Sequence, residues 1–148
     1  MALAEGLRNL RIAVVDDNEI NHKIMCKILY KFLGLHKSQV DLFLNGQMCL
    51  HALARARYDL ILLDIEMPVL DGCQTAIQIR NPRPAILDVN RSIPIIAVTT
   101  NAKEHQRQHY LSLGMDAVVG KPIVEPLQFI GLLKGVLAGQ KGGEWWCE

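Results

Sequence analysis

An α/β fold with a five-stranded parallel sheet is predicted for this chain by two features of its sequence. Five short apolar runs alternate with longer segments in which apolar residues recur at helical spacing. The central run, 60–63, is apolar at every position, which is typical of a parallel strand covered on both faces. Alternating strands and helices build such a sheet through right-handed crossovers. We therefore expect the doubly wound, flavodoxin-like order 2-1-3-4-5, with five helices.

The expected elements follow one another closely along the chain. Asn18 is placed to cap the first helix, because its short side chain accepts hydrogen bonds from first-turn amides. We expect that helix to bury an apolar stripe of Ile20, Ile24, Ile28 and Phe32, beside Met25, Leu29 and Leu33. The strands are expected at about 11–15, 40–44, 60–63, 93–98 and 117–119, and the later helices at 47–56, 73–80, 103–113 and 124–137.

Two closely spaced prolines follow the third expected helix. Asn81-Pro-Arg-Pro84 must end the third helix, because proline lacks a donor and restricts the residue before it. The connection 81–92 is longer than usual, so we interpret it as an insertion with a helical turn at 85–89. The domain is expected to span 10–138, after a lead-in at 1–9 and before a glycine-rich tail, 139–148, that carries Trp145-Trp146.

Composition narrows the class of protein. A length of 148 residues suits one domain, and a net charge of +1 favours neither nucleic acid nor an anionic membrane as a partner. No apolar stretch approaches the roughly 20 residues that span a bilayer. Residues 7–15 are too polar for a signal sequence. We expect a cytoplasmic protein, or a nuclear one in a eukaryote, whose four cysteines are reduced thiols.

Polar residues stand where four of the apolar runs end. Asp16-Asp17 follow the first, Asp64 the third, Thr99-Thr100 the fourth and Lys121 the fifth. Ligands of open α/β sheets bind beyond the carboxyl ends of the strands, and the expected order makes strands one and three neighbours. Three close carboxylates repel one another unless a cation neutralises them, and magnesium takes oxygen ligands. Acids, a hydroxyl and an ammonium together indicate a phosphoryl site with a divalent cation.

These residues lie in a set of short motifs that occur in order along the chain. The set resembles the receiver domain of two-component response regulators, most of all the receivers of hybrid histidine kinases. The motifs are V-V-D-D-N at 14–18, L-L-D-I-E-M-P at 62–68, D-G at 71–72, A-V-T at 97–99 and K-P at 121–122.

The resemblance implies a function and a set of roles. Asp64 is expected to accept a phosphoryl group from a phosphohistidine, assisted by Thr99 and Lys121. Mg²⁺ is expected on Asp17 and Asp64, on Asp16 through water, and on the backbone carbonyl of Glu66. The Lys121–Pro122 bond is expected to be cis. The implied partners are a histidine kinase or a histidine phosphotransfer protein, and the only implied catalysis is the chain's own phosphorylation and dephosphorylation. The apolar last helix adds the expectation of a homodimer.

Some residues depart from the family pattern and leave other interpretations open. Thr100 stands where receivers usually have a small residue, and Val118 where they often have an aromatic that moves with the threonine, so switching is expected to be weak. These departures keep open a receiver-like module that binds partners without phosphorylation. A haloacid-dehalogenase-type phosphatase would need an aspartate where Glu66 stands. A flavodoxin-like cofactor binder would need a phosphate-cradling loop after the first strand. His105 and His109 have a spacing that suits zinc.

Overall fold

Five parallel strands form the sheet in the order β2-β1-β3-β4-β5, as predicted. The computed structural model describes residues 7–82 and 85–139. The strands are β1 (Ile12–Val15), β2 (Val40–Phe43), β3 (Leu60–Asp64), β4 (Ile95–Thr99) and β5 (Ala117–Gly120). β3 therefore lies at the centre, paired with β1 on one side and β4 on the other.

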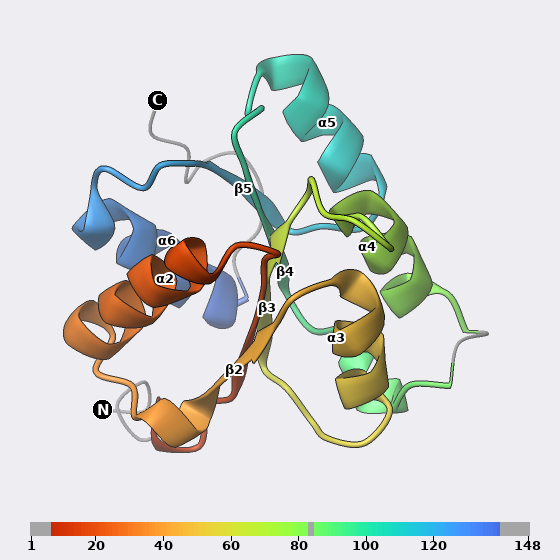
Figure 1. The fold of residues 1–148 in the computed structure, drawn as a ribbon, viewed down its shortest axis with the longest axis horizontal. Coiled ribbons are helices and arrows are strands. Elements are labelled where there is room, and N and C mark those ends of the chain that lie inside the picture. The colour runs from red at the N-terminus through yellow and green to blue at the C-terminus, as the bar shows by residue number, and fades with distance from the viewer. Residues whose placement is uncertain (1–6, 83–84, 140–148) are drawn as a thin grey trace.

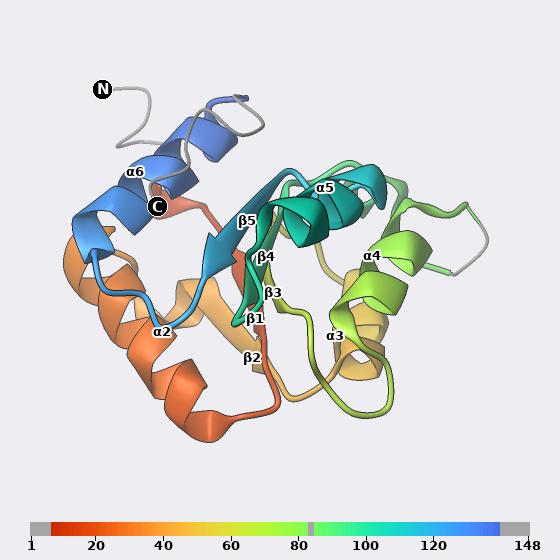
Figure 2. The same ribbon diagram turned by 90° about the horizontal axis from the view of Figure 1, so that it is seen from above.

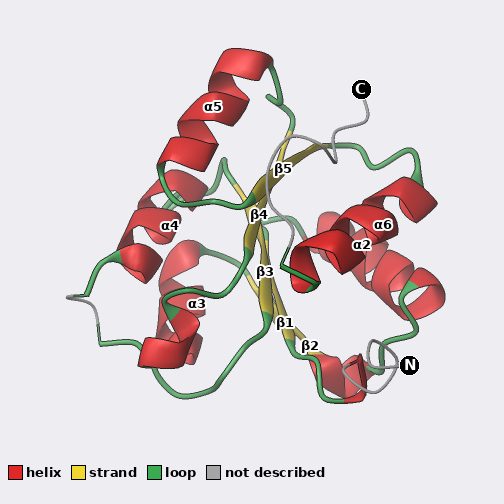
Figure 3. Ribbon diagram, turned by 180° about the vertical axis from the view of Figure 1, so that it is seen from behind, coloured by secondary structure: helices red, strands yellow, loops and turns green. Residues whose placement is uncertain are grey.

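Helices cover both faces of the sheet. α2 (Glu19–Phe32) and α6 (Pro126–Leu137) pack on one face, and α3 (Gly46–Leu53), α4 (Gly72–Arg80) and α5 (Glu104–Ser112) on the other (Figures 1 and 2). Figure 3 shows the same two layers from behind. Short 3-10 turns at Lys37–Gln39 and Asp88–Asn90 complete the described elements. None of the described helices has the length and apolar character to cross a membrane.

The core has two halves, one on each side of the sheet. Along β3, Leu60 and Leu62 pack into the cluster under α2 and α6, whereas Ile61 and Leu63 pack into the cluster under the other three helices. Successive side chains of a strand point to opposite faces, so a strand covered on both sides must be apolar throughout. This is the physical reason for the continuous run that predicted the strand.

α2 corrects one sequence-based expectation. Its cap is as predicted, with Asn18 Oδ1 accepting from the N–H groups of Ile20 and Asn21 at 2.8 and 3.3 Å. However, Ile20 and Ile24 are 66% and 50% exposed, so they are not part of the buried stripe. A helix of 14 residues is about 21 Å long, whereas the four residues of β1 span about 13 Å. The first turns of α2 therefore extend past the strand, and the inward position there belongs to His22, whose Nε2 lies 3.2 Å from the Phe43 carbonyl oxygen.

α6 begins later than predicted and buries its apolar face within the same chain. Pro126 occupies its first turn, where a missing N–H is tolerated. Leu127 remains 71% exposed. Most of its other large apolar side chains are buried in the domain's own core: Phe129, Ile130, Leu132, Leu133 and Val136. The homodimer stays a prediction.

The cysteines of the described residues are free thiols, as expected. Cys26 and Cys49 are buried, whereas Cys73 is only partly buried. The environment of Cys49 raises the pKa of its thiol to about 12 through burial, so it behaves as a small apolar residue. Cys147 and the Trp145-Trp146 pair lie outside the described residues.

The long connection from α4 to β4 is held to the rest of the domain by the buried side chains of Ile86 and Asn90. Its helical turn is a 3-10 turn at Asp88–Asn90, and Asn90 is fully buried. The Asn90 amide accepts from the N–H of Tyr58 at 3.0 Å and donates to the carbonyls of Leu53 and Ala56, both at 2.8 Å. Asn90 therefore satisfies three backbone groups in the connection between α3 and β3, at the edge of the sheet opposite the strand-end acids.

We expect Asn90→Ala to lower the free energy of unfolding by about 2–4 kcal/mol, because it removes three buried hydrogen bonds and leaves the Tyr58 N–H and the Ala56 carbonyl without their side-chain partner. Val89→Ala is the matched control, since Val89 is 52% exposed in the same turn and its truncation should change stability by less than about 0.5 kcal/mol. Urea unfolding with a common m-value measures both. Equal stabilities for the two variants would contradict the anchoring role.

Candidate active site

The strand-end acids meet at the carboxyl edge of the sheet. Asp64 is the last residue of β3, and Asp16 and Asp17 follow β1, its neighbour. One carboxylate oxygen from each of the three lies within 4.8 Å of the others. Asp16 and Asp64 are buried, whereas Asp17 is exposed. The sequence-predicted cluster is thus brought together, with an opening to solvent on the side of Asp17.

Asp16 is held by the chain around it. Its N–H donates to the Phe43 carbonyl at 3.0 Å, which ties the end of β1 to the end of β2. Its Oδ1 accepts from the N–H of Asn18 at 2.9 Å and from the side-chain amide of Asn21 at 3.4 Å. Sequence reasoning did not predict this contact of Asn21 with Asp16. The signal available in the sequence was its position in the first turn of the helix that follows Asp16 and Asp17.

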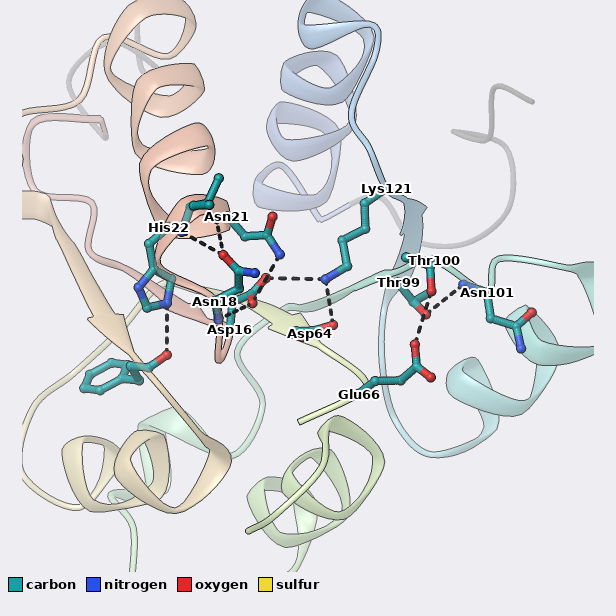
Figure 4. Close-up of polar contacts among 12 residues, drawn as sticks. Asp16, Asn18, Asn21, His22, Asp64, Glu66, Thr99, Thr100, Asn101 and Lys121 are labelled. Carbon is teal, nitrogen blue, oxygen red and sulfur yellow. Dashed lines mark hydrogen bonds and ion pairs between the residues drawn. The ribbon is translucent and has the colours of Figure 1, made fainter. Parts of the chain in front are cut away.

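Lys121 supplies the positive charge of the cluster. Its Nζ lies 3.0 Å from Asp64 Oδ1 and 3.4 Å from Asp16 Oδ2 (Figure 4). The backbone N–H of Lys121 donates to the Thr99 carbonyl at 2.9 Å, which fixes the end of β5 beside the end of β4. The Lys121–Pro122 bond is cis, as the resemblance implied.

Burial and charge shift the pKa values of the central pair. Burial raises the pKa of Asp64, its hydrogen bond to Lys121 lowers it, the neighbouring Asp16 raises it, and the net direction is upward. Burial lowers the pKa of Lys121, but Asp64 and Asp16 together outweigh that effect and raise it. Lys121 therefore stays charged at neutral pH, while Asp64 is destabilised as a bare carboxylate. A cation at the cluster would relieve this repulsion.

The remaining predicted residues lie around this centre. The Glu66 backbone is close enough to the Asp64 carboxylate to lower its pKa, so it adjoins the cluster. The side chain of Glu66 instead accepts from the hydroxyl of Thr100 at 3.1 Å, across solvent-exposed surface (Figure 4). Thr99 is buried at the end of β4, and its Oγ1 accepts from the N–H of Asn101 at 3.0 Å.

Gly72 permits the loop after β3 to fold back over the site. Its N–H donates to the Ile65 carbonyl at 2.8 Å. A Cβ at this position would lie 2.4 Å from the carbonyl oxygen of Asp64 and 2.7 Å from the Cα of Ile65. Both neighbours are backbone, which cannot move aside cheaply, so a side chain here would displace Asp64 itself.

Tyr110 is a second residue that sequence reasoning missed. It is the one buried residue of α5, and it packs into the core cluster that also contains Ala97 and Val118. The signal was present: a lone aromatic in a strongly polar helix is the natural anchor of that helix. His105 and His109 are exposed on the same helix. Within the described residues the three aspartates are the one group of three or more candidate metal ligands, so the histidine pair gains no third ligand there.

Comparison with known proteins identifies the family. Residues 12–130 match the response regulator receiver domain, and the chain belongs to this family. It is 35% identical over 114 residues to two-component system protein A of Emericella nidulans, covering 76% of this chain. It is 34% identical over 116 residues to hybrid signal transduction histidine kinase G of Dictyostelium discoideum, covering 78% of this chain. The chain is therefore a receiver domain of two-component phosphorelay signalling.

A solved receiver gives the structural counterpart. The receiver domain of a sensor histidine kinase from Pseudomonas aeruginosa PAO1 superposes with a TM-score of 0.73 at 31% identity, covering 88% of this chain and 98% of that one. That crystal structure has a magnesium ion coordinated in its active-site cleft. The curated relatives are much longer, since the matched region is 15% of the Emericella protein and 3% of the Dictyostelium kinase.

An all-oxygen cluster of this kind fits magnesium, which prefers carboxylate and carbonyl ligands and keeps several waters. We expect saturating Mg²⁺ to stabilise the wild-type fold, by about 2.7 kcal/mol at a hundred times its Kd. Asp17→Asn should remove most of that gain and should be no less stable than wild type when EDTA is present, because it relieves carboxylate repulsion. Thermal unfolding with Mg²⁺ and with EDTA measures both effects.

Asp88→Asn is the control for the loss of one charge, because the Asp88 side chain is fully exposed in the connection between α4 and β4. It should keep the full magnesium response. The response should also weaken as the pH is lowered, since the pKa of Asp64 is raised and the metal must displace its proton. A wild-type magnesium response in Asp17→Asn would contradict the assigned cluster.

Proposed function

We propose that Asp64 is the phosphoacceptor of this receiver and that Asp16, Asp17, Asp64 and the backbone carbonyl of Glu66 hold Mg²⁺ during the reaction. One observation carries the proposal. Three carboxylates with oxygens within 4.8 Å of one another share an ammonium that lies 3.0 Å from Asp64 Oδ1. Such a cluster is unfavourable unless it serves a cation and an anionic group together.

The chemistry follows from the positions of the side chains. A carboxylate oxygen of Asp64 forms a bond to phosphorus while the bond from phosphorus to the donor imidazole nitrogen breaks, and that nitrogen keeps the electron pair. Lys121 is placed to move from the bare carboxylates to an oxygen of the incoming group. The buried hydroxyl of Thr99 donates to another oxygen. Bound magnesium would neutralise charge on the transferred phosphoryl group.

The partner is a phosphohistidine on a histidine kinase or a histidine phosphotransfer protein. The proposed unit is 10–138, and it catalyses no reaction beyond its own phosphorylation and dephosphorylation. The proposed location is the cytoplasm, or the nucleus in a eukaryotic cell. The hybrid kinases among its relatives support this reading of the partner.

A surface beside the site suits such a partner. Asn21, Ile24 and Met25 of α2 face Lys121, Pro122 and Ile123 across a groove of about 180 Å³ that ends at Asp64. Exposed apolar side chains flank it, with Ile20 at 66%, Ile24 at 50% and Val124 at 79% exposure. Exposed apolar patches next to a reactive group indicate a protein-docking surface. We propose that the histidine-bearing partner docks over α2 and the loop after β5.

Wild-type chain incubated with acetyl phosphate and Mg²⁺ should gain one phosphoryl group that hydroxylamine removes, because an acyl phosphate is labile to that nucleophile. Asp64→Asn should gain none, and Asp88→Asn should be labelled like wild type. Intact mass reports the result. Labelling of Asp64→Asn at the wild-type level would place the nucleophile elsewhere. Failure of wild type to be labelled would favour a module that binds partners without phosphorylation.

The docking surface is tested by comparing two phosphoryl donors. Ile24→Ser should slow transfer from a phosphotransfer protein several-fold, because it removes an apolar contact at the rim of the groove. Labelling by acetyl phosphate should not change, since Ile24 takes no part in the chemistry. Val89→Ser, an equally exposed apolar change on the insertion, should leave both rates unchanged. Equal slowing with both donors in Ile24→Ser would remove the docking claim.

A further inference from the structure

His22 is the buried polar residue of α2, and the sequence motifs assigned no role to it. It lies in the first turn of the helix and is 5% exposed. Its Nε2 lies 3.2 Å from the carbonyl oxygen of Phe43, the last residue of β2 (Figure 4). A carbonyl oxygen can only accept a hydrogen bond, so Nε2 carries the proton and the imidazole is the donor. The ring is therefore addressed to one backbone atom at the carboxyl edge of the sheet.

The same carbonyl also holds Asp16. The backbone N–H of Asp16 donates to the Phe43 oxygen at 3.0 Å. A carbonyl oxygen has two lone pairs, so it can accept from Asp16 and from the imidazole of His22 at once. One atom thus joins the end of β1, the end of β2 and the first turn of α2. The imidazole is therefore one hydrogen-bonded atom away from the backbone of a residue in the acidic cluster.

The first turn of α2 holds the carboxylate of Asp16 as well. The backbone N–H of His22 donates to the Asn18 carbonyl at 3.1 Å, and the N–H of Asn18 donates to Asp16 Oδ1 at 2.9 Å. The side-chain amide of Asn21 reaches the same carboxylate oxygen at 3.4 Å. The other oxygen, Oδ2, faces Lys121 Nζ at 3.4 Å. The orientation of this carboxylate therefore depends on where the first turn of α2 lies.

Apolar packing does little to fix that turn. It extends past the end of β1, and Glu19 and Ile20 are exposed while Asn21 is only half-buried. Among the four residues of the turn, His22 is the one buried side chain. A segment with few buried contacts opens more readily than the core, so its position rests on the contacts that it has. Here the main contact to the sheet is the hydrogen bond from His22 to the Phe43 carbonyl.

We propose that His22 is a positioning residue for Asp16: its hydrogen bond to the Phe43 carbonyl fixes the first turn of α2, and that turn holds the Asp16 carboxylate in the acidic cluster. The inference rests on the proposed function, in which Asp16 helps to hold Mg²⁺. Groups that orient metal ligands typically change metal affinity by about 10–100-fold when they are removed. His22 acts through the backbone rather than on the carboxylate itself, so its removal should weaken magnesium binding by less, about three- to tenfold.

Three variants separate the hydrogen bond from general packing. His22→Leu stays apolar and bulky but cannot donate, whereas His22→Gln places an amide donor at a similar reach from the backbone. Cys26→Ala is the control, because Cys26 is buried one turn later in the same helix and does not contact Asp16 through these hydrogen bonds. The first readout is metal-free: amide hydrogen exchange of Asp16 in EDTA, relative to that of Leu62 in the central strand. This ratio should rise at least about threefold in His22→Leu and stay within about twofold of wild type in the other two.

Magnesium affinity is the second readout, from titration of the amide signals near Asp64. His22→Leu should bind Mg²⁺ about three- to tenfold more weakly than wild type, and His22→Gln and Cys26→Ala should stay within about twofold. Wild-type affinity in folded His22→Leu would overturn the inference and leave the proposed function standing. So would an equal loss in His22→Gln or in Cys26→Ala, since the donor would then not be the cause. No magnesium binding by wild type would overturn the proposed function, while the metal-free exchange would still show whether His22 holds Asp16.

Discussion

The crowding of three carboxylates around one ammonium is the constraint on which this domain depends. Parallel strands β1 and β3 must be neighbours for Asp16 and Asp64 to meet, and β5 must end beside β4 for Lys121 to reach them. Burial of these charges is unfavourable, so the cluster lowers the stability of the domain relative to a sheet without it. The layered helices supply the compensating apolar burial on both faces.

Much of this arrangement could be predicted from the sequence because the signals were local. The all-apolar run of β3, the polar residues at strand ends and the Asn18 cap each follow from rules on a few adjacent residues. The exposure of Ile20 and Ile24 could not be read this way, since it depends on how far a helix extends past the strand beneath it. Asn90 was missed for a related reason: its partners are distant in sequence, and its hydrogen bonds form only once the layers have packed.

The two edges of the sheet differ in how firmly they are built. At the amino edge, Asn90 closes three backbone hydrogen bonds, and the phenol of Tyr58 donates to Asp41 at 2.5 Å. At the carboxyl edge, backbone hydrogen bonds fix the strand ends, whereas the side-chain contacts of Lys121 are ion pairs and Glu66 meets Thr100 across exposed surface. A domain fastened at one edge and adjustable at the other can change its contacts around Asp64 without losing its fold.

The division of the helices between the two faces of the sheet separates two surfaces that other proteins could contact. The groove beside α2 and the sparsely anchored α5 lie on opposite sides of the strands. A donor that docks along α2, as proposed, would approach the domain on the side of the sheet opposite α5. In that arrangement, α5 would stay accessible while the donor is bound. For a domain embedded in a longer polypeptide, this separation allows donor and reader to be held in one assembly.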